Sequence, residues 1–281
     1  MNTKLIIVEG LPGFGKSTTA KLINEILTDM KIEAELFLEG NLDHPADYDG
    51  VAYFSKSDFD QLINSNVENK ELLSKRVIIE DDRVLIPYHK IRNQIGADFP
   101  NELFDLIVKR DIYELPLEQN QYLIENKWKK FAQNALNQNK ITIFECCFIQ
   151  NPITIGMIKY GAKQSTVLNY VKSLENAVND LNPLLIYVDQ KDLEFSFRKA
   201  VSERSKEWFD GFTNYYNNQG FGKENNVNGI EGTIEVLKTR KNIEDTIFDQ
   251  LEIKKVKVDN SGYILDDYKS SLVDLIQEHL K

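Results

Sequence analysis

The chain has 281 residues, of which 42% are hydrophobic and 28% are charged. This ordinary globular composition excludes a disordered or fibrous protein, and the length suits two domains or one α/β domain with an insertion. The net charge of −10 argues against a long nucleic acid as the partner, because proteins that bind one carry an extended basic face.

The first predicted elements are a strand over Leu5–Val8 and a helix over Lys16–Met30. The continuous apolar run of the strand is typical of a parallel sheet covered on both faces. Between them, Gly10–Ser17 reads Gly-Leu-Pro-Gly-Phe-Gly-Lys-Ser, a glycine-rich loop in a strand–loop–helix setting. A plain glycine turn would not require Lys-Ser at the start of the helix. The sequence therefore predicts a phosphate-binding loop.

The chemistry of such a loop lies in its main chain. Glycines allow consecutive N–H groups to converge on a triphosphate, and the positive end of the following helix faces the same anion. Lys16 is placed to reach the outer phosphates, and the Ser17 hydroxyl is placed to bind Mg²⁺. ATP and Mg²⁺ are the expected cofactors, and the residues expected to bind them are Gly10, Pro12, Gly13, Phe14, Gly15, Lys16, Ser17 and Thr18.

The pattern changes after a second strand predicted over Ala34–Leu38. Two strands around Asp81-Asp82 predict a β-hairpin, and helical patterns lie on either side of it. We expect a nucleotide-binding core at 1–40 and 140–281, with an insertion at 41–139 that forms an acceptor-binding or cap region. The predicted elements of the insertion are helices at Ser57–Ile63, Glu71–Ser74, Asn101–Arg110 and Leu117–Gln138, and strands at Arg76–Glu80 and Arg83–Tyr88.

Alternating strands and helices resume after the insertion. They predict an α/β fold with a doubly wound, mostly parallel sheet whose ligands bind outside the carboxyl ends of the strands. The segment Phe212–Gly232, rich in Asn and Gly, is predicted to be a mobile loop. The predicted strands are Ile141–Phe144, Leu184–Val188 and Ile253–Val258, and the helices are Val167–Leu181, Leu193–Phe209, Ile230–Leu251 and Tyr268–Leu280.

Two carboxylates follow predicted strands at the edge where ligands bind. Glu145 is a candidate water-mediated Mg²⁺ ligand or a substrate-orienting group, although a solvated strand end is the alternative. Glu39 could accept a proton from an attacking hydroxyl, or it could be a surface charge before Gly40. Which of the two carboxylates acts as the base stays open.

Arg198 and Arg204 lie on the segment that follows the strand Leu184–Val188. Phosphoryl transfer spreads negative charge over the equatorial oxygens, so a movable cationic segment over the triphosphate would stabilise that charge and exclude water. A solvated helix face is the simpler alternative. We expect these arginines to form a lid.

The remaining reactive residue types point to structural roles. The three histidines are too scattered for a metal site, and the adjacent Cys146 and Cys147 fall in a predicted strand with side chains on opposite faces. A disulfide is not expected. No apolar stretch reaches membrane-spanning length and no leader pattern is present, so we expect a cytoplasmic protein without a membrane partner.

The order of these features resembles the nucleoside and nucleotide kinase group of P-loop proteins. The resemblance covers roughly 1–40 and 140–281, and only the phosphate loop is a specific match. In that group the second strand is commonly followed by a carboxylate near the acceptor, which Glu39 matches. The third strand commonly ends in Asp or Glu followed by Arg, and here Glu145 is followed by Cys146. This departure leaves the acceptor undefined.

The sequence thus favours a Mg²⁺-dependent phosphotransferase that acts on a nucleoside, a nucleotide or another hydroxyl compound. Lys16, Glu39, Glu145, Arg198 and Arg204 are the candidate catalytic residues, and Ser17 and Glu145 are the candidate metal ligands. The alternatives are a nucleotide-dependent switch or ATPase acting with a protein partner, and a protein that only retains nucleotide. An oligomeric assembly is left open.

Overall fold

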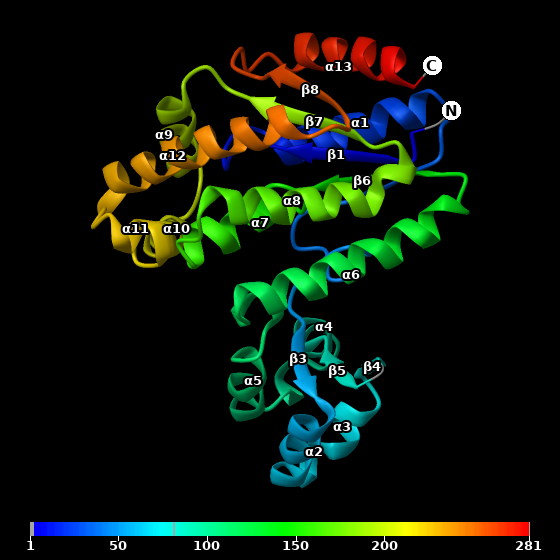
Figure 1. Cartoon of the computed structure of the whole chain (residues 1–281), viewed down its shortest axis with the longest axis vertical. Coiled ribbons are helices and arrows are strands. Elements are labelled where there is room, and N and C mark those ends of the chain that lie inside the picture. The colour runs from blue at the N-terminus through cyan, green and yellow to red at the C-terminus, as the bar shows by residue number, and fades with distance from the viewer. Residues whose placement is uncertain (1–2, 81, 281) are drawn as a thin grey trace. The chain divides into compact units, whose positions relative to one another are not determined.

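Figure 1 shows a computed structural model that describes residues 3–80 and 82–280. The chain divides into two compact units: a core unit of residues up to Glu39 and from Trp128 onward, and an inserted unit over Gly40–Lys127. The second boundary falls within helix α6 (Leu117–Leu136), so both units contain part of this helix. The inserted unit therefore ends earlier than the insertion expected at 41–139.

The core unit is built on a parallel sheet of five strands in the order β2-β6-β1-β7-β8. All residues of the central strand β1 are buried, as its apolar sequence predicts for a strand covered on both faces. The predicted α/β class with a doubly wound, mostly parallel sheet is confirmed. The strands are β1 (Leu5–Glu9), β2 (Ala34–Phe37), β6 (Ile141–Glu145), β7 (Leu184–Asp189) and β8 (Lys254–Asp259).

One face of this sheet is covered by α6 and by α12 (Gly229–Gln250). Trp128 of α6 packs edge to face on Phe144 of β6. The Tyr187 hydroxyl of β7 donates a hydrogen bond to Glu244 of α12. Phe144 and Tyr187 pair with Ile7 and Glu9, which lie two residues apart on one face of β1. The two helices therefore share a face, and the Glu9 side chain points to that same face.

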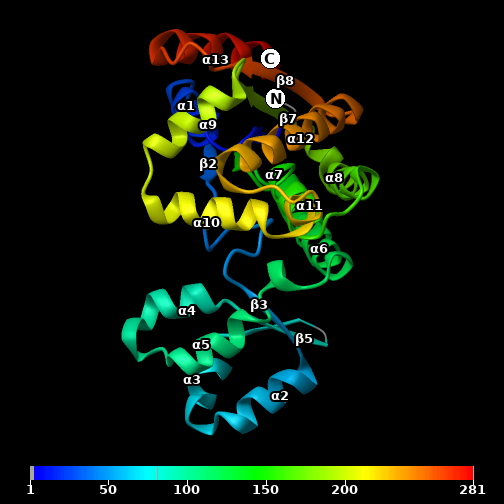
Figure 2. The same cartoon turned by 90° about the vertical axis from the view of Figure 1, so that its left-hand side faces the viewer.

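The other face is covered by α1 (Lys16–Asp29) and α13 (Leu265–His279), which lie side by side (Figures 1 and 2). Hydroxyl groups of Thr19 and Tyr268, 2.8 Å apart, join the two helices. Among the residues with a described placement, none of the helices is both long and apolar enough to cross a membrane. The remaining helices of the core unit are α7 (Gln150–Ile153), the π-helix η4 (Thr154–Lys159), α8 (Gln164–Val178), η5 (Asn179–Leu181), α9 (Leu193–Ser202), α10 (Lys206–Asn217) and α11 (Gly220–Glu224).

The inserted unit has its own antiparallel sheet in the order β3-β5-β4. The predicted hairpin is confirmed by the pairing of β4 with β5, and its turn residue 81 lies outside the described residues. The second hairpin strand ends at Ile86 rather than Tyr88, because Pro87 opens helix α4. An apolar cluster from these strands and helices forms a separate core. The elements are β3 (Ala52–Ser55), α2 (Lys56–Ser65), η1 (Val67–Asn69), α3 (Lys70–Ser74), β4 (Ile78–Glu80), β5 (Arg83–Ile86), α4 (Tyr88–Ile95), η2 (Gly96–Asp98), α5 (Asn101–Val108) and η3 (Ile112–Glu114).

Three sequence predictions about the core unit are wrong. The single helix expected over Leu193–Phe209 is two helices, because Ser205 caps the start of α10 by accepting a hydrogen bond from the Trp208 N–H. The loop expected over Phe212–Gly232 is mostly helical, formed by the end of α10, by α11 and by the start of α12. Cys146 and Cys147 follow β6 instead of lying in it, and both are buried free thiols.

Candidate functional site

The loop between β1 and α1 has the backbone that a phosphate cradle requires. Gly10 has a φ of +147°, and a Cβ there would lie 2.5 Å from the Val188 carbonyl oxygen of β7. Gly15 has a φ of +96°, and a Cβ there would lie 2.4 Å from Nδ2 of Asn260. Only glycine fits at these two positions, so the sheet and the residue after β8 fix the course of the loop.

The loop lines a cavity of about 460 Å³ in the core unit. Lys16 is nearly buried, and its Nζ donates to the Leu11 carbonyl oxygen at 3.0 Å across the loop. Phe14 is buried beneath the loop, and its carbonyl oxygen accepts a 2.9 Å hydrogen bond from Asn260. Of the residues expected at the nucleotide, those that line the cavity are Pro12, Gly13, Gly15, Lys16, Ser17 and Thr18.

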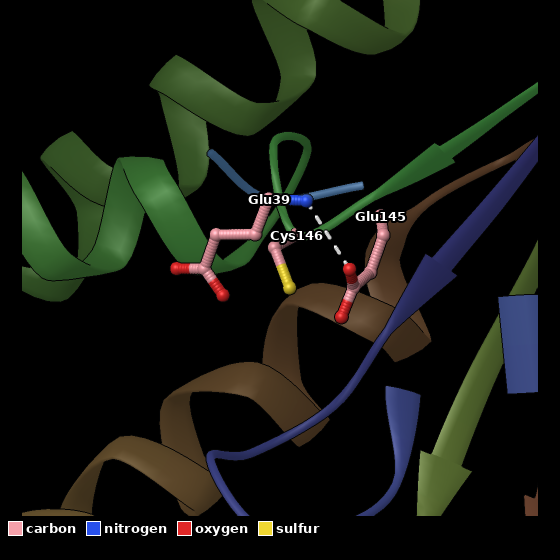
Figure 3. Close-up of side chains that lie close together, drawn as sticks. All are labelled: Glu39, Glu145 and Cys146. Carbon is pink, nitrogen blue, oxygen red and sulfur yellow. Dashed lines mark hydrogen bonds between the residues drawn. The ribbon is translucent and has the colours of Figure 1, made fainter. Parts of the chain in front are cut away.

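The two predicted carboxylates meet at this cavity. Ser17 Oγ donates to Glu145 Oε1 at 2.6 Å. The Glu39 backbone N–H donates to Glu145 Oε2 at 3.2 Å, and Figure 3 shows this second bond. Both carboxylates line the cavity with Lys16. Parallel strands β2 and β6 end beside the phosphate loop, so residues that are far apart in sequence come together at one edge of the sheet.

Cys146 joins this group through an unusual backbone conformation. Its φ is +73°, and its N–H donates to the Val8 carbonyl oxygen at 3.2 Å, so the chain turns sharply just after β6. One ligand atom each from Glu39, Glu145 and Cys146 lies within 4.8 Å of the others, and Figure 3 shows the sulfur between the carboxylates. Burial raises the pKa of the Cys146 thiol well above its usual range. The two carboxylates offer oxygen donors, the ligand type that suits Mg²⁺.

A buried carboxylate that the sequence analysis did not single out fixes the turn after β6. Glu9 accepts hydrogen bonds from the backbone N–H groups of Phe148, Ile149 and Gln150 at 2.7, 2.9 and 3.1 Å. Burial raises its pKa to about 7, although these three bonds act in the opposite direction. Gln150 in turn donates from Nε2 to Oε1 of Glu39 at 3.0 Å. Glu9, at the end of β1, thus holds Gln150, and Gln150 in turn holds the Glu39 carboxylate at the cavity.

The two arginines predicted to form a lid lie in different places. Arg198 is on α9, outside the set of residues that line the cavity, and forms ion pairs with Glu194 and Glu231 at 3.0 and 2.6 Å. Arg204 lies in the link between α9 and α10 and does line the cavity. Its guanidinium stacks over the Trp208 ring, 4.2 Å from the centroid.

The far wall of the cavity consists of residues that sequence reasoning missed or undervalued. Trp208, Phe212 and Tyr216 follow one another at four-residue spacing and stack along one face of α10. This spacing is a helical signal, but it was hidden because the sequence pattern placed Phe212 in a loop. Polar groups from α7 and the start of η4 complete the wall: Gln150, Asn151 and Thr154.

A second cavity, of about 240 Å³, adjoins the phosphate loop on the side of α13. It shares Gly13, Gly15 and Thr18 with the first cavity. Its rim carries apolar side chains from the segment after β8, of which Tyr263 and Leu265 are exposed. A ligand that occupies the loop can therefore extend from one cavity into the other.

No protein-family model matches the sequence, and no curated protein matches it. Solved structures do match, and one is described as thymidylate kinase from Candida albicans. This chain is 14% identical to that protein with a TM-score of 0.44, over 99% of this chain and 92% of that chain. The fold itself is a parallel α/β sheet with the glycine-rich loop between its central strand and α1.

Proposed function

We propose that the chain is a Mg²⁺-dependent phosphotransferase that moves the γ-phosphoryl group of ATP to a small-molecule acceptor. The observation that carries this proposal is the 2.6 Å hydrogen bond between Ser17 Oγ and Glu145 Oε1. It joins two residues 128 positions apart at a cavity lined by the phosphate loop and Lys16. A hydroxyl at the start of a helix beside a strand-ending carboxylate is the arrangement that a phosphate-bound cation requires.

The residues present fit Mg²⁺ at this position. Ser17 and Glu145 would hold the ion, directly or through water, because both offer hard oxygen atoms within hydrogen-bond distance of each other. When bound, the ion would neutralise charge on the phosphates.

The triphosphate would lie along the loop, with the backbone N–H groups and Lys16 as its donors. Its nucleoside would extend into the second cavity, where Tyr263 and Leu265 offer apolar surface for a planar base. The exposure of both side chains supports this placement, because large apolar groups at a rim gain from covering by a ligand.

The acceptor would lie at the polar and aromatic wall of the first cavity. There the hydroxyl oxygen of the acceptor would form a bond to the γ-phosphorus while Glu39 takes the hydroxyl proton. The bond between the γ-phosphorus and the bridging oxygen breaks at the same time, and that oxygen leaves with ADP. Gln150 supports this role, because its bond to Oε1 of Glu39 leaves the second carboxylate oxygen for the acceptor. Arg204, on the link beside the loop, would stabilise the charge on the transferring group.

An acceptor screen tests the proposal and separates it from its competitors. The protein would be incubated with ATP and Mg²⁺ together with nucleosides, nucleoside monophosphates, sugars and aminoglycosides, and release of ADP would be followed. We expect release that depends on one class of acceptor. Release without an acceptor would favour a switch or ATPase that acts with a protein partner, and ATP that stays bound without turnover would favour a binding protein.

A further inference from the structure

A charged cluster lies buried behind the aromatic wall of the first cavity. Arg240 of α12 is fully buried, and its Nε donates to Oε1 of Glu244, one helical turn later, at 2.6 Å. The Tyr187 hydroxyl donates to the other carboxylate oxygen at 2.6 Å. A buried ion pair is costly to form and is weak evidence of a stabilising role alone. The roles proposed for the phosphate loop and for Glu39 and Glu145 do not involve this cluster.

The guanidinium reaches the cavity through two hydroxyl groups. Nη1 of Arg240 donates to the hydroxyl of Tyr216 at 2.6 Å and to Oγ1 of Thr154 at 3.2 Å, and both of these residues line the cavity. A guanidinium carries donors only, so both hydroxyl oxygens must act as acceptors toward it. Each hydroxyl proton must then point elsewhere.

The direction left for those protons is the cavity. Within residues 3–80 and 82–280, neither hydroxyl donates to a protein acceptor. Burial raises the pKa of Tyr216, so its phenol keeps the proton that it would donate. Nη2 of Arg240 is also buried and has no partner in the described part of the chain, so the cluster is not closed on itself. The wall therefore offers two O–H donors backed by a buried cation.

We propose that Thr154 and Tyr216 form a binding subsite for the oxygen atoms of a phosphoryl group, with Arg240 as a positioning residue that holds both hydroxyls as donors. The inference rests on the proposed function and assigns two specific contacts to it. Two convergent donors match an oxyanion, whose oxygen atoms accept but cannot donate. Lys16 lines the same cavity as both hydroxyl-bearing residues, so the subsite faces the space that the phosphate loop borders.

Two phosphoryl groups share this chemistry: the γ-phosphoryl group of the nucleotide and a phosphate carried by the acceptor. Calorimetric titrations of wild type, Tyr216→Phe and Thr154→Val would distinguish them. The probes are Mg²⁺ with ADP, Mg²⁺ with the non-hydrolysable analogue adenylyl imidodiphosphate, and inorganic phosphate added to protein saturated with that analogue. Each substitution removes one donor and nearly preserves side-chain volume.

A γ-phosphoryl subsite predicts that each variant binds the analogue about tenfold more weakly while its affinity for ADP is unchanged, because a hydrogen bond to a charged group is lost. An acceptor subsite predicts instead that binding of inorganic phosphate weakens by a similar factor. Thr154→Ser, which keeps the hydroxyl, should bind like wild type in either case. Tyr170→Phe removes a buried phenol of α8 outside the cavity and is the matched control.

The role of Arg240 is tested by the double variant Arg240→Met and Glu244→Gln, which leaves no unpaired charge in the interior. If Arg240 positions the hydroxyls, the double variant should reproduce the selective loss of analogue binding expected for the hydroxyl variants. If the cluster is merely structural, the double variant should unfold at a lower temperature, and its ratio of analogue affinity to ADP affinity should be unchanged. Affinities within twofold of wild type for every probe would overturn the subsite. If the wild-type protein binds neither nucleotide, the proposed function fails. Titration with inorganic phosphate alone then tests the subsite. Phosphate binding that depends on the two hydroxyls supports the subsite, and any other result overturns it.

Discussion

The phosphate end and the far end of the cavity are built in different ways. The phosphate end is a continuous run, Gly10–Ser17, whose glycines adopt the positive φ angles that the loop backbone needs. The far end is assembled from side chains of the adjoining helices α7 and η4 and of α10, which lies much later in the chain. A site made of main chain can be recognised in a short stretch of sequence, whereas a site made of side chains depends on how helices are placed.

The comparison predicts the largest effect at the phosphate end. Lys16→Ala removes the ammonium group from the loop, and we expect acceptor-dependent ADP release to fall at least about 100-fold. The fold should persist, because the described hydrogen bond of Lys16 goes to a carbonyl oxygen within the same loop. Turnover and circular dichroism would be measured together. Turnover like that of wild type would remove the loop from the mechanism.

The carboxylate beside Ser17 offers a second way to sharpen the comparison. Glu145→Gln keeps the side-chain size but weakens a metal ligand, so the Mg²⁺ concentration for half-maximal ADP release should rise about 10-fold to 100-fold. Asp189, which ends strand β7 of the same sheet but lies outside the cavity lining, provides the control variant Asp189→Asn. An identical Mg²⁺ dependence in the two variants would argue against the metal site.

Glu9 ends the strand before the phosphate loop and accepts a hydrogen bond from Gln150 at the far end of the cavity. We expect it to affect the stability of the folded protein. The folded pKa is about 7 against an ordinary value of 4.5, so between these values the folded protein binds more protons than the unfolded chain. The free energy of unfolding should therefore fall as pH rises through this window, by a total of about 3 kcal/mol. Glu9→Gln cannot titrate and should lack this part of the pH dependence. Urea unfolding from about pH 5 to pH 8 measures it, and parallel profiles for the two proteins would contradict the assignment.

The smallest effects distinguish the two arginines. Arg204→Ala should lower turnover about tenfold, because it removes a cation from the cavity. Arg198→Ala breaks only exposed ion pairs, which contribute little because solvent screens them, and should leave turnover within about twofold of wild type. Equal losses in both variants would show that α9 moves Arg198 into the site during turnover.

The sheet and the phosphate loop could be predicted because both depend on local patterns. Apolar runs such as Leu5–Val8 identify buried parallel strands, and the glycine spacing identifies the loop. Glu39 and Glu145 could be proposed because parallel strands end at one edge of a sheet, and they do meet there.

The aromatic wall could not be predicted for a physical reason. The four-residue spacing of Phe212 and Tyr216 has meaning only once Ser205 is known to start a new helix, and the Asn-rich sequence that follows favours a loop. Arg240 was equally hidden, because a charged residue on a long helix is usually solvated and nothing in its own segment indicates burial.

Calorimetry of the wild-type protein with adenylyl imidodiphosphate, with and without Mg²⁺, tests the central claim most directly. The account predicts one binding site per chain, with affinity that rises when Mg²⁺ is present, because Ser17 and Glu145 hold the cation against the phosphates. The absence of binding up to millimolar concentrations of the analogue and Mg²⁺ would contradict it.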